Sequence, residues 1–150
     1  MFVKPVLQAL VLAEHVYQDV TGKKIIAGTF NQVRFNRNLS PLQERERPDG
    51  TKEKILLGGL HGGSPYAYIS LTDVCDGTEL LLQFVNLTKN QVLFGKKLSV
   101  KCDDRLRTVE IVAPLPPLPV VEAGTYAFEV VWAGEILGSH IILAEELPDS

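Results

Sequence analysis

Large apolar side chains alternate with small or polar ones along residues 124–146. If Ala133 and Gly134 form a two-residue turn, the flanking segments pair as a hairpin in which Val130 lies opposite Leu137 and Tyr126 lies opposite Ile141. One face of this hairpin is then apolar, and it consists of Tyr126, Phe128, Val130, Trp132, Leu137, Ile141 and Leu143. Exposing so much apolar surface to water is unfavourable, so the pattern predicts a sheet face that packs against a second layer of structure.

Other parts of the chain show the same two-residue period. Asp76 and Gly77 form the strongest short-range turn signal, which predicts a hairpin with Leu71 opposite Leu82 and Ile69 opposite Phe84. A third reversal is predicted at residues 20–22, between strands at 6–17 and 24–35. Two further strands are predicted at 91–102 and 105–114.

No segment sustains a helical period, and turn residues recur between short apolar stretches. These features predict an all-β fold with little or no helix, in which residues 1–150 form one antiparallel β-sandwich (immunoglobulin-like) of about seven to nine strands. Residues 36–53 are expected to form a long loop between strands, with a helical turn between Pro41 and Pro48 as the weaker alternative. The proline-rich residues 113–119 predict an extended bridge into the last hairpin.

The amino-acid composition and the net charge limit the kinds of molecule that this protein is expected to bind. The chain has 150 residues, 45% of them hydrophobic, and a net charge of −3. Nucleic acids and anionic membranes attract clustered Lys and Arg, so this mild acidity argues against both. No apolar run reaches the roughly 18 residues that a membrane span requires, and the first residues lack the cleavage site of a signal peptide. We therefore expect a cytoplasmic protein.

The residue types that carry chemistry are scattered along the chain. The histidines lie far apart in sequence, and Cys75 and Cys102 lack the spacing of a zinc site. The glycines at 58–63 have no phosphate-loop lysine, and no nucleophile motif is present. We therefore expect no catalytic residue, no metal and no cofactor. Both thiols are expected to be reduced, although the sequence leaves open whether they pair.

Two segments resemble a bacterial family of uncharacterised proteins, known only as a domain of unknown function. In the first segment the resemblance rests on Glu14, Gly22, Lys23, Gly28 and Phe30. In the second it rests on Gly124, Tyr126, Phe128, Gly134, Glu135, Leu137 and Gly138. The resemblance covers about 40 residues at the two ends and implies a small β-rich domain. It implies no activity and no catalytic residue.

The leading hypothesis is a non-enzymatic domain that binds another protein or assembles into a homo-oligomer. The second face of the last hairpin suits such an interface, with Val131, Ile136, His140 and Ile142 as its candidate residues. The alternative is a small-molecule or calcium-binding module that uses loops 61–66 and 73–79. Its candidate residues are His61, Tyr66, Tyr68, Asp73 and Asp76, with Glu79, Asp103 and Asp104 as further carboxylates for calcium.

Overall fold

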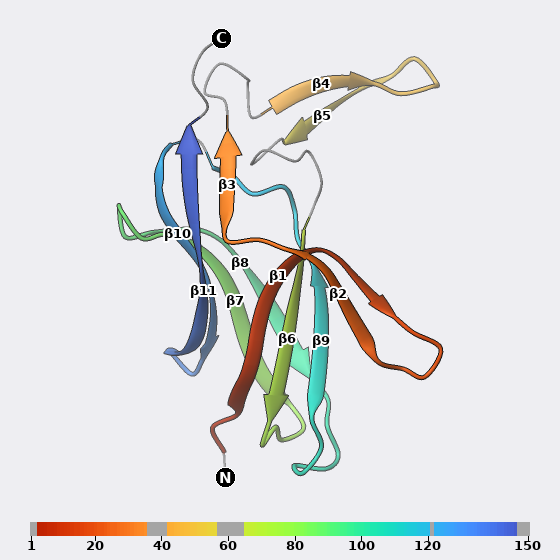
Figure 1. Ribbon diagram of the computed structural model, residues 1–150, viewed down its shortest axis with the longest axis vertical. Helices are drawn as coiled ribbons and strands as arrows, with labels where there is room; N and C mark the ends of the chain where they lie inside the picture. Colours follow the sequence, from red (N-terminus) through yellow and green to blue (C-terminus); the bar gives the residue numbers. More distant parts are fainter. Residues whose placement is uncertain (1–2, 36–41, 57–64, 121, 147–150) are drawn as a thin grey trace.

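The computed structural model describes residues 3–35, 42–56, 65–120 and 122–146 (Figure 1). These residues contain eleven strands and no helix. The strands are β1 (Val6–Gln18), β2 (Lys24–Thr29), β3 (Gln32–Phe35), β4 (Leu42–Glu46), β5 (Lys52–Leu56), β6 (Tyr66–Thr72), β7 (Thr78–Asn86), β8 (Gln91–Val100), β9 (Val109–Pro114), β10 (Gly124–Trp132) and β11 (Glu135–Glu146). The strands predicted at 91–102 and 105–114 are therefore present as β8 and β9.

Nine of these strands form two packed sheets, which confirms the predicted all-β sandwich (Figure 1). One sheet has the order β2-β1-β6-β9, and the other has the order β3-β11-β10-β7-β8. Strands β1-β6-β9 facing β11-β10-β7-β8 reproduce the A-B-E against G-F-C-C′ arrangement of immunoglobulin-like sandwiches. Strand β3 pairs with β11 in parallel, whereas the other pairings between described strands are antiparallel.

The core lies between the two sheets and is built from every second residue of the facing strands. Ile69 and Leu71 of β6 face the second sheet, in which Phe84 of β7 packs between Tyr126 and Phe128 of β10. The ring centroids of Phe84 and Phe128 are 4.7 Å apart, and those of Phe84 and Tyr126 are 5.4 Å apart. Burying these rings contributes both apolar area and favourable ring contacts.

The reversal predicted at residues 20–22 is confirmed, but the strand predicted at 24–35 is two strands, β2 and β3, which belong to different sheets. The reversal joins β1 to β2, with Gln18 paired to Lys24. The Asp19 carboxylate accepts hydrogen bonds from the backbone N–H groups of Thr21 and Lys23, each at 2.9 Å, and Gly22 takes a φ of 89°. These contacts fix the turn. A hydrogen bond from the Thr21 hydroxyl, together with the backbone bond from Lys23, holds the pKa of Asp19 below its usual value.

The hairpin predicted at Asp76 and Gly77 is wrong. A turn does form there, because the Thr78 N–H donates to the Cys75 carbonyl at 3.1 Å and Gly77 has a φ of 82°. However, β6 pairs with β1 and β9, and β7 pairs with β10 and β8. The segment from residue 73 to residue 77 therefore crosses between sheets that lie about 10 Å apart. Both strands bury one apolar face in either arrangement, so their local pattern could not distinguish a hairpin from a crossover.

The turn at Ala133 and Gly134 is confirmed, but the predicted pairing of the two strands is wrong by one residue. Val131 pairs with Ile136, whereas Val130 pairs with Gly138, so Leu137 is the extra residue of a β-bulge. The bulge reverses the faces of the remainder of β11. Ile142 and Ala144 are buried, and Ile141 and Leu143 are exposed.

The bulge sets Gly138 against β1, where a Cβ would lie 2.4 Å from Leu7 Cδ2. A residue larger than glycine at this position would therefore push the two strands apart or displace Leu7.

The long loop predicted for residues 36–53 is also wrong over residues 42–53, and so is the helical turn predicted between Pro41 and Pro48, whereas residues 36–41 lie outside the described residues. Strands β4 and β5 form a separate two-stranded sheet, with Glu46 paired to Lys52. The turn between them uses Asp49, whose carboxylate accepts a 2.9 Å hydrogen bond from the Thr51 N–H. Each of these strands has three consecutive charged residues next to the turn, at 44–46 and 52–54, so apolar and polar residues do not alternate there in the sequence.

The connection from β9 to β10 agrees with the predicted bridge, since residues 115–120 belong to no strand or helix. It ends in a corner built around Tyr126, whose hydroxyl donates a 2.8 Å hydrogen bond to the Glu122 carbonyl. The Glu122 carboxylate in turn accepts from Asn86 Nδ2 at 3.0 Å and pairs with Lys89 Nζ at 2.8 Å. A buried tyrosine near the start of this strand, bonded to the backbone upstream, is the tyrosine corner of immunoglobulin-like sandwiches.

We expect Tyr126→Phe to lower the free energy of unfolding by about 1–2 kcal/mol, because the substitution removes one hydrogen bond and leaves the Glu122 carbonyl without this donor. Urea denaturation measures the change. Tyr17→Phe is the control, because the Tyr17 side chain is exposed and its loss of a hydroxyl should change stability by less than about 0.5 kcal/mol. Equal effects of the two substitutions would contradict a structural role for the corner.

Stability should also fall at alkaline pH through Tyr126. Burial raises the pKa of Tyr126 above its ordinary value, and the charge of Glu122 raises it further. The neutral phenol is thus favoured in the folded state, so its contribution is complete below the unfolded pKa of about 10 and is lost as the pH rises through the folded pKa. The stability difference between wild type and Tyr126→Phe should therefore narrow above about pH 10. A difference that stays constant to pH 11 would count against this.

Candidate functional site

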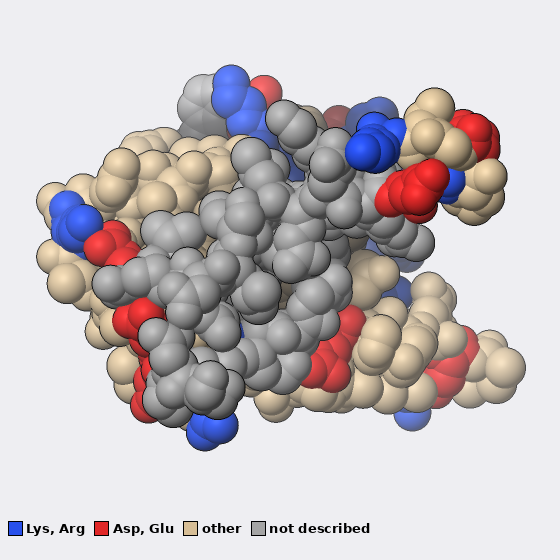
Figure 2. Space-filling model, turned by 90° about the horizontal axis from the view of Figure 1, so that it is seen from above, with Lys and Arg blue, Asp and Glu red and all other residues tan. Residues whose placement is uncertain are grey.

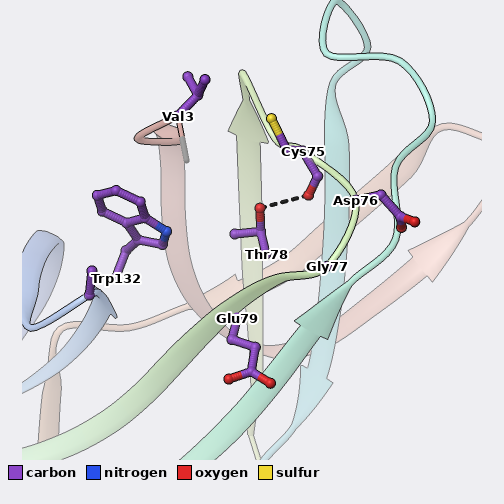
Figure 3. Close-up of a pocket in the computed structure, with 8 residues that line it drawn as sticks. Val3, Cys75, Asp76, Gly77, Thr78, Glu79 and Trp132 are labelled. Carbon is purple, nitrogen blue, oxygen red and sulfur yellow. Dashed lines mark hydrogen bonds between the residues drawn. The ribbon is translucent and has the colours of Figure 1, made fainter. Parts of the chain in front are cut away.

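A hollow lies at the end of the sandwich where the β6–β7 crossover meets the β10–β11 turn (Figure 3). Its volume is about 600 Å³, within the range of small-molecule sites. It is lined by Val3, Cys75, Asp76, Gly77, Thr78, Glu79, Trp132 and Ala133. The crossover that the sequence had assigned to a hairpin supplies Cys75, Asp76 and Gly77 to this wall, and the start of β7 supplies Thr78 and Glu79.

The polar groups of the hollow do not converge on one point. The Thr78 hydroxyl donates to the Cys75 carbonyl at 2.6 Å, so its proton is already used (Figure 3). Asp76 and Glu79 both project away from Trp132, and their carboxylates lie apart from each other (Figure 3). An Asp73 carboxylate oxygen, just outside the hollow, lies 3.8 Å from a guanidinium nitrogen of Arg105. Among the described residues that line the hollow, Trp132 is the only aromatic one.

The residues predicted for the ligand loops are not brought together. His61 lies outside the described residues. Tyr66 and Tyr68 lie on β6, on the side of the four-stranded sheet turned away from the core, and Tyr66 is roughly 20 Å along the strand from Asp73. The Tyr68 hydroxyl is bonded to Glu110, and burial, together with that carboxylate, raises the pKa of Tyr68. Of the four candidates that the structure describes, only Asp76 lines the hollow.

Within the described ranges, His, Cys, Asp and Glu side chains form no group of three that could hold a metal ion. Cys75 and Cys102 are both half-buried free thiols, and Cys102 Sγ lies 3.0 Å from the Asp104 carbonyl. Exposed His15 stacks on Tyr17, with 5.7 Å between ring centroids. His140 Nε2 lies 2.8 Å from the Phe30 carbonyl and holds the β2–β3 connection against β11.

A second candidate site is the outer face, by which we mean the side of the five-stranded sheet turned away from the core. Four large apolar side chains are exposed on it: Ile136 at 53%, Ile141 at 47%, Leu143 at 51% and Val92 at 56%. Between them lie the strand-centre residues Val85 and Ala127, which are almost completely buried. The outer face therefore carries apolar side chains both at its margins and between them.

One polar row crosses the outer face. Gln83 Nε2 of β7 donates a 2.9 Å hydrogen bond to Glu129 Oε1 of β10, directly across the strand pair. Glu129 is only 9% exposed although it lies on a sheet surface. Neighbouring side chains and Gln83 thus hold this carboxylate in a fixed orientation and shield most of it from water.

The predicted interface residues divide between the two sides of the sheet. Val131 and Ile136 lie on the outer face, as expected. Ile142 is fully buried in the core, and His140 is half-buried against Phe30, so neither lies on the face predicted for it. The bulge at Leu137 is the reason, because it moves Ile141 and Leu143 outward in their place. Sequence reasoning also missed Val92 and the Gln83–Glu129 pair, which only the β10–β7–β8 pairing brings beside this hairpin.

No family model and no curated protein matches this chain. The resemblance to an uncharacterised bacterial family therefore stays a prediction. Among the described residues, no helix is long and apolar enough to cross a membrane. On the side of the molecule seen in Figure 2, the described Lys and Arg side chains stand in separate small groups next to Asp and Glu.

Proposed function

We propose that this protein is a non-enzymatic β-sandwich domain that binds a protein surface through its outer face, either in another protein or in its own oligomer. The observation that carries the proposal is the cluster of four exposed apolar side chains, Val92, Ile136, Ile141 and Leu143, on one face of one sheet. Apolar residues exposed singly are ordinary on a protein surface, whereas their grouping on one face is typical of an interface.

The composition of the outer face supports protein as the class of partner. Interface centres are poor in charge and are surrounded by polar rims. Here the centre contains Ala127 and Val85, while the Arg34–Glu145 pair, 3.9 Å apart, lies at the margin next to β3. The single central charge, Glu129, already accepts a hydrogen bond, so covering it would not leave it without a partner. We extend the proposal to a cytoplasmic location and to membership of the bacterial family.

A photo-crosslinking amino acid at position 141 tests the proposal in cells that produce the protein. We expect adducts of higher mass from position 141, because its side chain lies on the proposed contact surface. Position 25 is the matched control: the wild-type residue is also isoleucine, and it is 48% exposed on the other sheet. Adducts from neither position, or equal adducts from both, would be evidence against binding through the outer face.

A second candidate function is the binding of a small molecule or calcium in the hollow, using residues 73–79 of the predicted loops. It is favoured by the volume of about 600 Å³ and by the half-buried indole of Trp132 in its wall. The aromatic face offers a flat apolar surface, and Asp76 and Glu79 offer oxygens at the rim.

Trp132 is the only tryptophan of the chain, so its fluorescence reports on the hollow directly. If a ligand binds there, titration with calcium or with simple sugars should shift the emission and saturate. Asp76→Asn should weaken a calcium response and leave the unliganded spectrum unchanged, because Asp76 is exposed and points away from the indole. A flat titration with both ligand classes would remove them from consideration for the hollow.

A further inference from the structure

We infer that the partner of the outer face is a second copy of this chain, packed face to face about a two-fold axis that runs between β10 and β7, parallel to these strands. This inference rests on the proposed function of the outer face. It adds the identity of the partner and the orientation in which it docks. A homodimer of this kind needs a face that complements itself under the two-fold rotation.

The register of β10 and β7 meets this requirement. Three rows cross the strand pair on the outer face: Ala127 beside Val85, Glu129 beside Gln83, and Val131 beside Leu81. A two-fold axis midway between the strands exchanges the two members of each row. Each β10 residue of one copy then faces the β7 residue of the same row in the other copy.

The central row becomes a closed hydrogen-bonded network under this operation. Glu129 of one copy faces Gln83 of the other, so the two carboxylates are not placed opposite each other. The Gln83 amide has two N–H hydrogens, of which one is donated to Glu129 of its own chain at 2.9 Å. The second N–H is available for the other copy's carboxylate, whose Oε2 is free to accept it. Both polar groups would thus be satisfied in a buried setting.

The row of Ala127 and Val85 continues on the neighbouring strands in apolar side chains, which the two-fold rotation also places opposite each other. Ile141 continues the Ala127 row on β11, and Val92 continues the Val85 row on β8. The two-fold operation places Ile141 of one copy over Val92 of the other. These side chains are 47% and 56% exposed in the single chain, so their mutual burial supplies the hydrophobic gain.

The size of the face fits a dimer that dissociates measurably. The axis lays β11, β10, β7 and β8 of one copy over β8, β7, β10 and β11 of the other. Four strands spaced about 4.8 Å apart, over the roughly 30 Å length of a nine-residue strand, present about 600 Å². Stable interfaces of standard size bury about 800 Å² on each partner, so this overlap falls in the range of weaker, transient interfaces, which fits a dimer that dissociates measurably.

Sedimentation equilibrium over a wide range of protein concentration tests the inference. We expect a monomer–dimer equilibrium whose dissociation constant rises at least about tenfold in Ile141→Glu, because the new charge would be buried against Val92. Ile25→Glu is the matched control and should leave the constant within about twofold, since Ile25 has the same exposure on the other sheet. A wild-type protein that is monomeric at every concentration, or equal effects of the two substitutions, would overturn the inference.

The orientation of the two copies in the dimer can be tested separately. In a Cys75→Ser, Cys102→Ser background, cysteines placed at positions 141 and 92 of the same chain should form disulfide-linked dimers on treatment with diamide. Cysteines at positions 141 and 25 should not link copies efficiently. Linkage that is equal in the two variants would overturn the two-fold arrangement. If the wild type is monomeric but position 141 still crosslinks to a different protein in cells, the dimer is excluded while the proposed binding function stands.

Discussion

The packing of Phe84 between Tyr126 and Phe128, against the inner face of the opposite sheet, is the constraint on which the rest of the structure depends. Each strand that reaches this cluster must present alternate residues to it. Three irregular features satisfy that demand: the crossover at residues 73–77, the bulge at Leu137 and the corner at Tyr126. Each one places an apolar side chain between the sheets at the point where a regular strand would have turned it outward or left it unpaired.

The same bulge also shapes the surface. By moving Ile142 into the core it exposes Ile141 and Leu143, so core packing and the composition of the outer face are decided by one residue inserted at Leu137. The outer face then acquires Val92 and the Gln83–Glu129 pair from strands distant in sequence. The proposed binding surface thus combines side chains of β11 and β8 with those of the two strands between them. Strands held in a sheet have little backbone entropy left to lose on binding.

The hollow at the end of the sandwich is built differently from the outer face. Its wall combines the crossover and a hairpin turn with the ends of β7 and β10, which supply Thr78, Glu79 and Trp132. The Thr78 hydroxyl is committed to the Cys75 carbonyl, and the carboxylates of Asp76 and Glu79 lie apart from each other. The hollow therefore offers contact area but no polar groups that converge on a ligand, and it supports a binding function less strongly than the outer face does.

The sequence by itself determined the features that are local. Alternating side chains predicted strands, and Ala133–Gly134 and residues 20–22 were recognised as turns because their backbone requirements are met by neighbouring residues alone. Which strands pair, and on which face a side chain lies, depended on tertiary structure. Asp76 and Gly77 encode a turn but not whether its two strands share a sheet, and a single bulge at Leu137 was enough to reverse the faces of Ile141 and Ile142. The physical reason is that burial is satisfied by many pairings of apolar strands, and only the packing of the whole core selects one of them.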